Sequence, residues 1–237
     1  MAELIGAFFL TFAGVSAMIA GGDLIVVALA QGGALALAVY AFGNISGAHV
    51  NPAISASLFV QRKISARDFV MYVIFQIIGA TLAAFIAVNV FPHGNVNGAV
   101  GGATLGSMTR FPSSSLYNPG GALLLEVIMT FMLATAVATV IRAPDHFSPA
   151  VGFLIGGTLM VCILFGGPWT GASLNPARSM GPALAYGDAA IWPSLWIYWV
   201  GPLIGGVLAG LVFKWLRGEK LTIAKEPAKA PESPPPA

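Results

Sequence analysis

The sequence predicts an all-α membrane protein in which six transmembrane helices and two re-entrant half-helices form an inverted repeat. The first observation is composition: of 237 residues, 57% are hydrophobic and 8% are charged, whereas a soluble domain carries about a quarter charged residues. So little charge cannot cover a surface in water, so the outer surface must face lipid. The other two observations are the lengths of the apolar stretches and a repeat that relates the two halves of the chain.

The apolar stretches fall into two length classes. A transmembrane helix needs about 20 mostly apolar residues, and six stretches are about that long: 4–22, 24–44, 69–91, 121–141, 147–167 and 191–213. Two others, 52–60 and 176–186, are too short to cross and span about half a bilayer at roughly 1.5 Å per residue. We therefore expect six crossings and two half-helices.

Charged residues and the start of the chain set the expected topology. No Lys or Arg precedes the first apolar stretch, unlike in a signal peptide, so we expect this stretch to be retained as the first helix. Basic residues gather on one side of the six spans: Arg62, Lys63, Arg67, Arg142, Lys214, Arg217, Lys220, Lys225 and Lys229. The positive-inside rule makes that side cytoplasmic. The chain is thus expected to be a multi-pass protein of the cell membrane with both termini in the cytoplasm.

A single membrane domain is expected over residues 1–217. It comprises a first repeat over about 1–91, an extracellular connector over 92–120 and a second repeat over about 121–217. The remaining residues, 218–237, are rich in charge and proline, which is typical of a disordered cytoplasmic tail. The basic residues form no stripe along a helix, so the sequence gives no indication of a nucleic-acid partner.

The two halves of the chain share a pattern. The string ELIGAFFL, which begins at Glu3, matches EVIMTFML, which begins at Glu126, in its Glu, Ile, Phe and Leu positions. Asn51 and Asn175 follow these acids by 48 and 49 positions. Each half has three crossings, and an odd number makes the second half enter from the opposite face. The repeats are therefore predicted to be inverted, with half-helices that meet near the membrane midplane.

Each half-helix begins with the motif Asn-Pro-Ala. Asn is a favoured N-cap and Pro a favoured first helical residue, so capping explains either motif alone but not its recurrence in paired half-helices. A capping Asn uses its side-chain oxygen on the backbone and leaves its two amide protons free to point into a pore. The positive ends of two facing half-helices would also repel cations and turn a passing water molecule. The two motifs comprise Asn51, Pro52, Ala53, Asn175, Pro176 and Ala177.

These features together resemble a known family. The motifs SGAHVNPA and SLNPARS, the six spans and the inverted halves are similar to those of the aquaporin (major intrinsic protein) family, over nearly the whole chain from Glu3 to about Arg217. The resemblance implies a passive channel for water and other small neutral solutes that excludes protons and ions. It also implies a homotetramer with one pore per subunit, and no cofactor.

The resemblance further implies a selectivity filter, whose positions by spacing from the motifs are Gln31, Ile163, Ala172 and Arg178. A charge at Arg178 is costly in lipid, so the side chain must either face a wet cavity or form a structural salt bridge with an acidic partner. Gln31 departs from the aromatic residue or His usual in the family, and Ile163 from the His of strict water channels. The filter is therefore expected to be wider and less polar, which adds ammonia, urea and hydrogen peroxide to water. Ser179 stands where the glycerol branch carries Asp, so glycerol is the second choice.

Two acids and one histidine have competing interpretations. Glu3 and Glu126 occupy equivalent places and could serve proton or ion coupling, but a structural role fits better, because membrane burial requires acceptors for the backbone donors of a re-entrant loop. His49 precedes the first motif without a nearby second His or Cys. We expect it to make a loop-ordering hydrogen bond rather than to bind a metal.

Other classes of protein find less support in the sequence. No nucleophile–base pair or metal-ligand cluster is evident, so an enzyme is not expected. An ion-coupled secondary transporter remains an alternative, because inverted repeats with broken helices also occur in that class. A purely structural membrane protein is the third alternative, which a complete lack of osmotic permeability would support.

Overall fold

The computed structural model describes residues 1–91, 115–140, 150–186 and 191–217. These residues form α1 (Ala2–Ile19), α2 (Leu24–Ser46), α3 (Pro52–Val60), α4 (Ala66–Val90), α5 (Pro119–Val140), α6 (Val151–Thr170), α7 (Pro176–Tyr186), the 3-10 turn η1 (Trp192–Ser194) and α8 (Ile197–Leu216). Six candidate membrane spans, the last of them η1 together with α8, are long and apolar enough to cross a membrane, whereas α3 and α7 are half-helices of 9 and 11 residues. The predicted all-α membrane fold is confirmed.

The bounds of both half-helices agree with the sequence analysis, while the long helices differ by a few residues. α4 begins earlier than expected because Ser65 caps it by accepting a hydrogen bond from the Asp68 amide at 3.1 Å. α6 continues through Pro168 in its last turn and ends where Gly171 adopts a left-handed φ of 82°. α8 follows a separate 3-10 turn that contains Pro193. Residues 92–114 of the expected connector and the expected tail at 218–237 lie outside the described residues.

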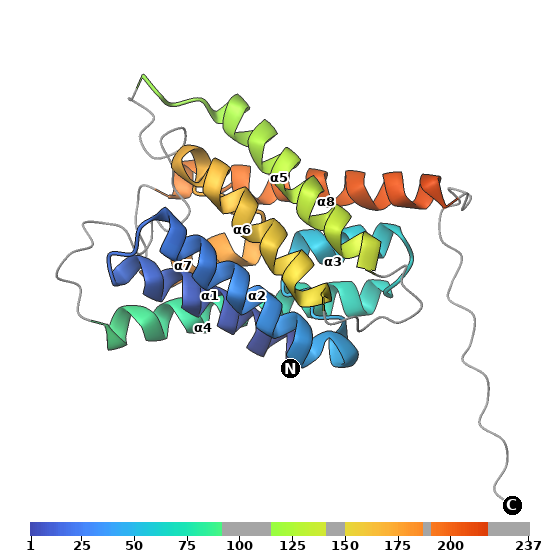
Figure 1. Ribbon diagram of the computed structural model, residues 1–237, viewed down its shortest axis with the longest axis horizontal. Helices are drawn as coiled ribbons and strands as arrows, with labels where there is room; N and C mark the ends of the chain where they lie inside the picture. The colour runs from blue at the N-terminus through green and yellow to red at the C-terminus, as the bar shows by residue number, and fades with distance from the viewer. Residues whose placement is uncertain (92–114, 141–149, 187–190, 218–237) are drawn as a thin grey trace, which may run out of the picture.

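The helices form an inverted pair of halves (Figure 1). α1 packs against α4 and α5 against α8, while α2 packs against α6 across the two halves. Each half-helix packs on the last helix of the other half, α3 on α8 and α7 on α4. α2 and α8 end, and α4 begins, toward the right-hand end of the bundle in Figure 1, so the basic residues next to those helix ends share one side. We call this side, which also carries Arg62 and Lys63, the basic side.

The two halves approach closely where α2 crosses α6. A Cβ placed on Gly32 would lie 2.2 Å from Met160 Cγ and 2.6 Å from the Gly156 carbonyl oxygen. A Cβ on Gly156 would lie 2.3 Å from the Gly32 carbonyl oxygen. Small residues let membrane helices pack backbone to backbone in this way. The reciprocal contact between Gly32 and Gly156 therefore marks the axis that relates the halves.

We expect Gly32→Ala to destabilise the protein by about 1–3 kcal/mol, because the added methyl overpacks this crossing. Gly33→Ala is the matched control, since a Cβ on the neighbouring Gly33 would meet nothing within 4 Å and alanine favours the helix by about 0.5–1 kcal/mol. Thermal unfolding in detergent, followed by circular dichroism, compares the two. Equal melting temperatures for both variants would show that the α2–α6 crossing is not tightly packed.

Candidate functional site

Two short loops lead from the long helices into the half-helices. Gly47 ends α2 with φ 85° and Gly171 ends α6 with φ 82°. In the loops that follow, Ala48, Val50, Ala172 and Leu174 have φ values of 46°, 45°, 46° and 54°. L-residues rarely adopt this left-handed region, a β-branched residue least of all. Such strain persists only where surrounding contacts determine the backbone, and it concentrates at functional sites.

The contacts that determine the first loop come from Glu3. Its carboxylate accepts hydrogen bonds from the backbone amides of His49 at 2.9 Å and Val50 at 2.7 Å. The Ser46 hydroxyl and the Gln76 side-chain amide each donate to it at 2.6 Å. The loop's buried backbone donors thus have the acceptor that the membrane interior otherwise lacks.

Glu126 holds the second loop in the same manner. Its carboxylate accepts from the backbone amides of Ser173 at 2.9 Å and Leu174 at 2.8 Å, and from the Thr170 hydroxyl at 2.7 Å. Both acids are buried, at 2% and 0% exposure. These contacts are the ones that a bracing role requires.

Several members of these networks were not singled out from the sequence. Tyr72 and Tyr198 donate their hydroxyls to the carbonyls of Ser46 at 2.9 Å and Thr170 at 2.7 Å. The signal for them was the repeat itself, since each tyrosine lies on the last long helix of its half. Gln76 has no such signal, because the second half carries proline at the matching place, Pro202.

His49 takes part in the first network through its ring. Its Nδ1 lies 3.1 Å from the Ser55 hydroxyl, which in turn accepts from Gln76 at 3.1 Å. In the second half, Ser173 and Ser179 make the corresponding hydroxyl contact. The His49 ring therefore orders the loop through a hydrogen bond to the half-helix it precedes.

The two Asn-Pro-Ala motifs meet inside the bundle. The Asn51 side-chain oxygen accepts from the Ala53 amide at 2.8 Å, and the Asn175 oxygen accepts from Ala177 at 3.0 Å and Arg178 at 3.2 Å. Each Asn is thus the N-cap of its half-helix. The proline at the first helical position lacks an N–H that would need a partner.

The asparagine amides also join the two loops. Asn51 Nδ2 donates to the Leu174 carbonyl at 2.8 Å, and Asn175 Nδ2 donates to the Val50 carbonyl at 2.9 Å. This corrects the expectation that both amide protons of each Asn are free. One proton of each amide holds the opposite loop, which leaves one for the interior of the bundle.

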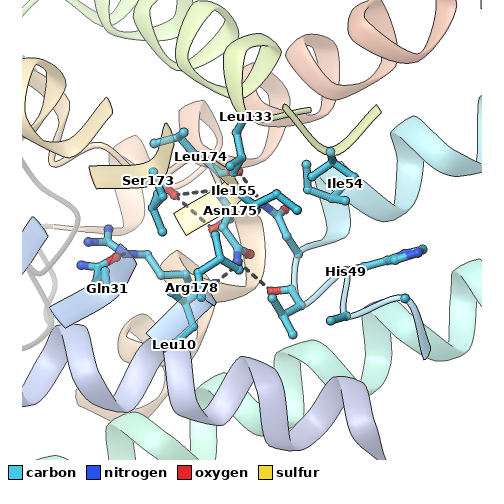
Figure 2. A pocket seen from close by; sticks show the side chains of 17 residues that line it. Leu10, Gln31, His49, Ile54, Leu133, Ile155, Ser173, Leu174, Asn175 and Arg178 are labelled. Atoms are coloured by element: carbon cyan, nitrogen blue, oxygen red, sulfur yellow. Dashed lines mark hydrogen bonds between the residues drawn. The ribbon is translucent and has the colours of Figure 1, made fainter. Parts of the chain in front are cut away.

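A narrow cavity of about 30 Å³ lies along these loops, and Figure 2 shows its lining. That volume suffices for about two water molecules, because one needs roughly 10–15 Å³. Most lining residues occur as pairs from equivalent places in the two halves: Leu10 with Leu133, Leu35 with Leu159, His49 with Ser173, Val50 with Leu174, and Asn51 with Asn175.

The two ends of this cavity differ in polarity. Gln31 and Arg178 line it on one side of the asparagines, and their repeat equivalents on the other side are Ile155 and Ile54. In Figure 2 the side chains of Gln31 and Arg178 lie next to each other, and Ile54 lies away from them. We call the end with Gln31 and Arg178, which lies away from the basic side, the polar end; toward the basic side Ile54 and Ile155 take their places, and His49 also lines the cavity there.

A second cavity of about 320 Å³ continues from the polar end. It is lined by Arg178 and Ile163, together with Asp23 and Leu24 at the start of α2. Arg178 lines both cavities and is 5% exposed. Its guanidinium therefore stands at the boundary between the narrow cavity and the wide one.

The structure brings together three of the four residues expected at the filter. Arg178 Nε donates to Gln31 Oε1 at 3.2 Å, and Ile163 lines the wide cavity beside Arg178. Ala172 differs, because it lines neither of these two cavities and is fully buried. Its methyl lies toward α6, 3.6 Å from where a Cβ on Gly166 would be.

The fold and this site together define a class of protein: a multi-pass membrane protein with two capped half-helices that meet across a narrow water-sized cavity. The major intrinsic protein family model matches residues 1–213. The chain belongs to the major intrinsic protein, or aquaporin, family.

Individual relatives include proteins of both main branches. The chain is 40% identical to aquaporin Z of Bradyrhizobium diazoefficiens, over 92% of each chain. It is 38% identical to a glycerol uptake facilitator-like protein of Lactiplantibacillus plantarum, covering 92% of this chain and 98% of that one. The structure resembles that of the aquaglyceroporin from Plasmodium falciparum, with a TM-score of 0.74 and 25% identity over 90% and 93% of the two chains.

Proposed function

We propose that this chain is a passive channel for water and small neutral solutes, including ammonia, urea and hydrogen peroxide. The observation that carries the proposal is the meeting of two half-helix N-termini across a cavity wide enough for single water molecules. Each Asn keeps one amide proton for a passing oxygen, and Asn51 and Asn175 belong to opposite halves. A water molecule that accepts from both amides uses both of its lone pairs, so it can donate to its neighbours in the file but cannot accept a proton from them.

Exclusion of ions and protons is the second part of the proposal. Half-helix N-termini carry about half a positive charge each, and Arg178 adds a full one at the mouth of the narrow cavity. A cation that enters the narrow cavity would have to lose its hydration water while it is repelled by Arg178 and by both half-helix N-termini. Proton relay also fails where the water chain is reoriented at its centre.

Glycerol is the second candidate solute, and a specific observation favours it. A relative of 38% identity is named a glycerol uptake facilitator-like protein. Ser179 argues against glycerol, because the glycerol branch carries Asp at this position. In this chain the Ser179 hydroxyl shares a hydrogen bond with the Ser173 hydroxyl of the loop.

The contacts of the two buried acids argue against an ion-coupled transporter. Coupling needs an ionisable group that can change its state, and the carboxylates of Glu3 and Glu126 are occupied by four and three donors from their loops and neighbouring side chains. We infer that both acids brace the half-helices.

Topology and assembly follow from the same proposal. With Arg62, Lys63, Arg67, Lys214 and Arg217 on the basic side, the positive-inside rule places that side, and both termini, in the cytoplasm. The polar end of the narrow cavity, with Gln31 and Arg178, then faces outward, and the end with Ile54 and His49 faces the cytoplasm. We propose a homotetramer with one such cavity per subunit.

Stopped-flow light scattering on proteoliposomes tests the choice of solute. Purified protein in vesicles is challenged in turn with water, urea, ammonia and glycerol gradients in the absence of any ion gradient. We expect the protein to raise water flux well above that of empty vesicles, and water flux to exceed glycerol flux. Glycerol flux that rivals water flux would move the chain to the glycerol branch, and flux that appears only with an ion gradient would favour the coupled transporter.

A further inference from the structure

The Gln76 side chain of α4 joins the carboxylate that braces the first loop to the first half-helix. It is fully buried, and its amide nitrogen donates to Glu3 Oε2 at 2.6 Å and to the Ser55 hydroxyl at 3.1 Å. The Glu3 carboxylate also accepts from three other donors, so it offers only acceptors and the Gln76 nitrogen, not its oxygen, must face it. Both protons of that nitrogen are thus used, while Gln76 Oε1 has no hydrogen-bond partner within the described residues.

The bond from Gln76 decides what the Ser55 hydroxyl can do. Within the described part of the chain, Ser55 Oγ has two partners, the Gln76 amide nitrogen and His49 Nδ1, each 3.1 Å away. A hydroxyl has one proton to donate, and the amide nitrogen can only donate, so the Ser55 proton is left for the ring. His49 Nδ1 is therefore the acceptor, and the proton of the neutral imidazole lies on Nε2.

The second half of the chain reaches the same arrangement without a glutamine. Ser173 and Ser179 correspond there to the histidine and the serine of the first half. Ser173 donates its hydroxyl proton to the Asn175 carbonyl at 3.1 Å. In its contact with Ser179 it can therefore only accept. The serine of the half-helix is thus the donor in both halves, which supports the direction assigned to the bond between Ser55 and His49.

The His49 ring borders the narrow cavity on the side of Ile54, away from Arg178 (Figure 2). Tyr72 meets the ring edge-on, with ring centroids 5.0 Å apart. Gly47 lets the ring lie close to the backbone, since a Cβ there would be 3.1 Å from His49 Nε2. Within the described residues Nε2 has no hydrogen-bond partner, yet it is not one of the enclosed side-chain atoms that lack one. Its proton is therefore available to a water molecule in the cavity.

We propose that Gln76 is a positioning residue that acts through Ser55 to fix His49 as the neutral Nε2–H tautomer, and that this tautomer gives the file of water molecules a donor on the side away from Arg178. A bare Nε2 would instead accept a proton from the adjacent water molecule and turn it round. The tautomer is a property of the folded chain, whereas the part its proton plays in water passage rests on the proposed channel function.

Solid-state NMR of the full chain in liposomes, with 15N-labelled histidine and no histidine tag, tests the tautomer directly. The chain has three histidines, so His93→Asn and His146→Asn together leave the His49 ring as the only signal. Transfer of magnetisation between each ring nitrogen and its own proton shows which nitrogen is protonated. We expect a proton on Nε2 and none on Nδ1. A proton on Nδ1, whether in the other neutral tautomer or in the imidazolium ion, overturns the inference.

Two variants in this background show whether Gln76 is the cause. Gln76→Met is close in size and removes both N–H donors, which frees the Ser55 hydroxyl to accept from the ring, so we expect a second signal from the Nδ1–H tautomer. Ser55→Ala removes the partner of Nδ1 and should also give both tautomers. Ile74→Met is the control on α4, at a side chain that is 45% exposed, and it should keep the Nε2–H form alone.

Size-exclusion profiles and circular dichroism confirm that each variant is folded before its spectrum is used. The Nε2–H form alone in folded Gln76→Met overturns the role of Gln76. The same result in Ser55→Ala overturns the control of the tautomer by this chain of contacts, and it decides the matter if Gln76→Met does not fold.

Water permeability of the same proteoliposomes tests the part played by the Nε2 proton. We expect the two variants to lose about threefold in permeability per channel, as the loss of one hydrogen bond to water would give, and the loss to follow the share of the Nδ1–H tautomer. Wild-type permeability in a variant whose tautomer has shifted overturns this part. Wild-type protein that passes no water refutes the channel function instead and leaves the tautomer result standing.

Discussion

Arg178→Ala is expected to make the protein leak small cations. A cation about 4 Å from the guanidinium is repelled by about 4 kcal/mol at an effective dielectric constant of about 20. Removing that repulsion raises cation permeability by up to about 1,000-fold. The half-helix ends remain, so this figure is an upper bound. Sodium and proton fluxes into proteoliposomes loaded with ion-sensitive dyes measure the change.

The matched control for Arg178 is its repeat equivalent. Ile54→Ala also shortens a side chain that lines the narrow cavity, but it removes no charge. We expect Ile54→Ala to keep cations out. Unchanged cation exclusion in Arg178→Ala, or an equal leak in both variants, would contradict the role given to the guanidinium.

Glu126→Ala is expected to prevent stable folding. The change leaves the backbone amides of Ser173 and Leu174 and the Thr170 hydroxyl without the acceptor that they now share. Each unsatisfied buried donor costs about 1–3 kcal/mol, so the sum reaches several kcal/mol against a total stability of about 5–15 kcal/mol. The yield of monodisperse protein in detergent and its melting temperature should both fall sharply.

Two further variants show whether the brace is the cause. Leu124→Ala lies on the same helix at a side chain that is 60% exposed, and it should leave yield and melting temperature near wild type. Glu126→Gln keeps one acceptor oxygen and turns an amide group toward a backbone N–H, so it should be intermediate. Glu126→Ala protein as stable as Leu124→Ala would show that the loop does not depend on this carboxylate.

The short-range features of the fold could be predicted because local residues encode them. Asn51 and Asn175 mark the start of each half-helix through capping, and proline follows at once, so the bounds of α3 and α7 agree with expectation. The sequence predicted that α6 ends at residue 167, before its last turn, because proline usually ends a helix and Pro168 follows. In the structure Gly171 ends the helix instead.

The long-range features could be predicted only where the repeat pointed to them. Glu3 and Glu126 were identified through their equivalent places, although their partners lie 43 to 73 residues away. The bond from Asn51 to the Leu174 carbonyl joins residues 123 apart, and nothing local encodes it. Because that bond depends on how two loops meet, the prediction that both amide protons of each Asn are free was wrong.

The contact between Gln31 and Arg178 shows the same limit at the filter. Spacing from the motifs predicted that both residues belong to the filter. It did not reveal that Arg178 bonds to Gln31, or that Gly14, where a Cβ would lie 2.7 Å from Gln31 Nε2, makes room for the amide. The position of the Ala172 methyl was also not predictable, since it depends on the left-handed backbone at that residue. Spacing therefore predicted the filter positions, while contacts between helices decide which side chains line the two cavities.

Osmotic water permeability of proteoliposomes, measured with no ion gradient and at several temperatures, tests the central claim most directly. If the paired half-helices form a water pathway, the rate of vesicle shrinkage rises in proportion to the amount of protein and depends weakly on temperature, because water need not enter the hydrocarbon. Shrinkage no faster than that of empty vesicles, with their steeper temperature dependence, would contradict the claim.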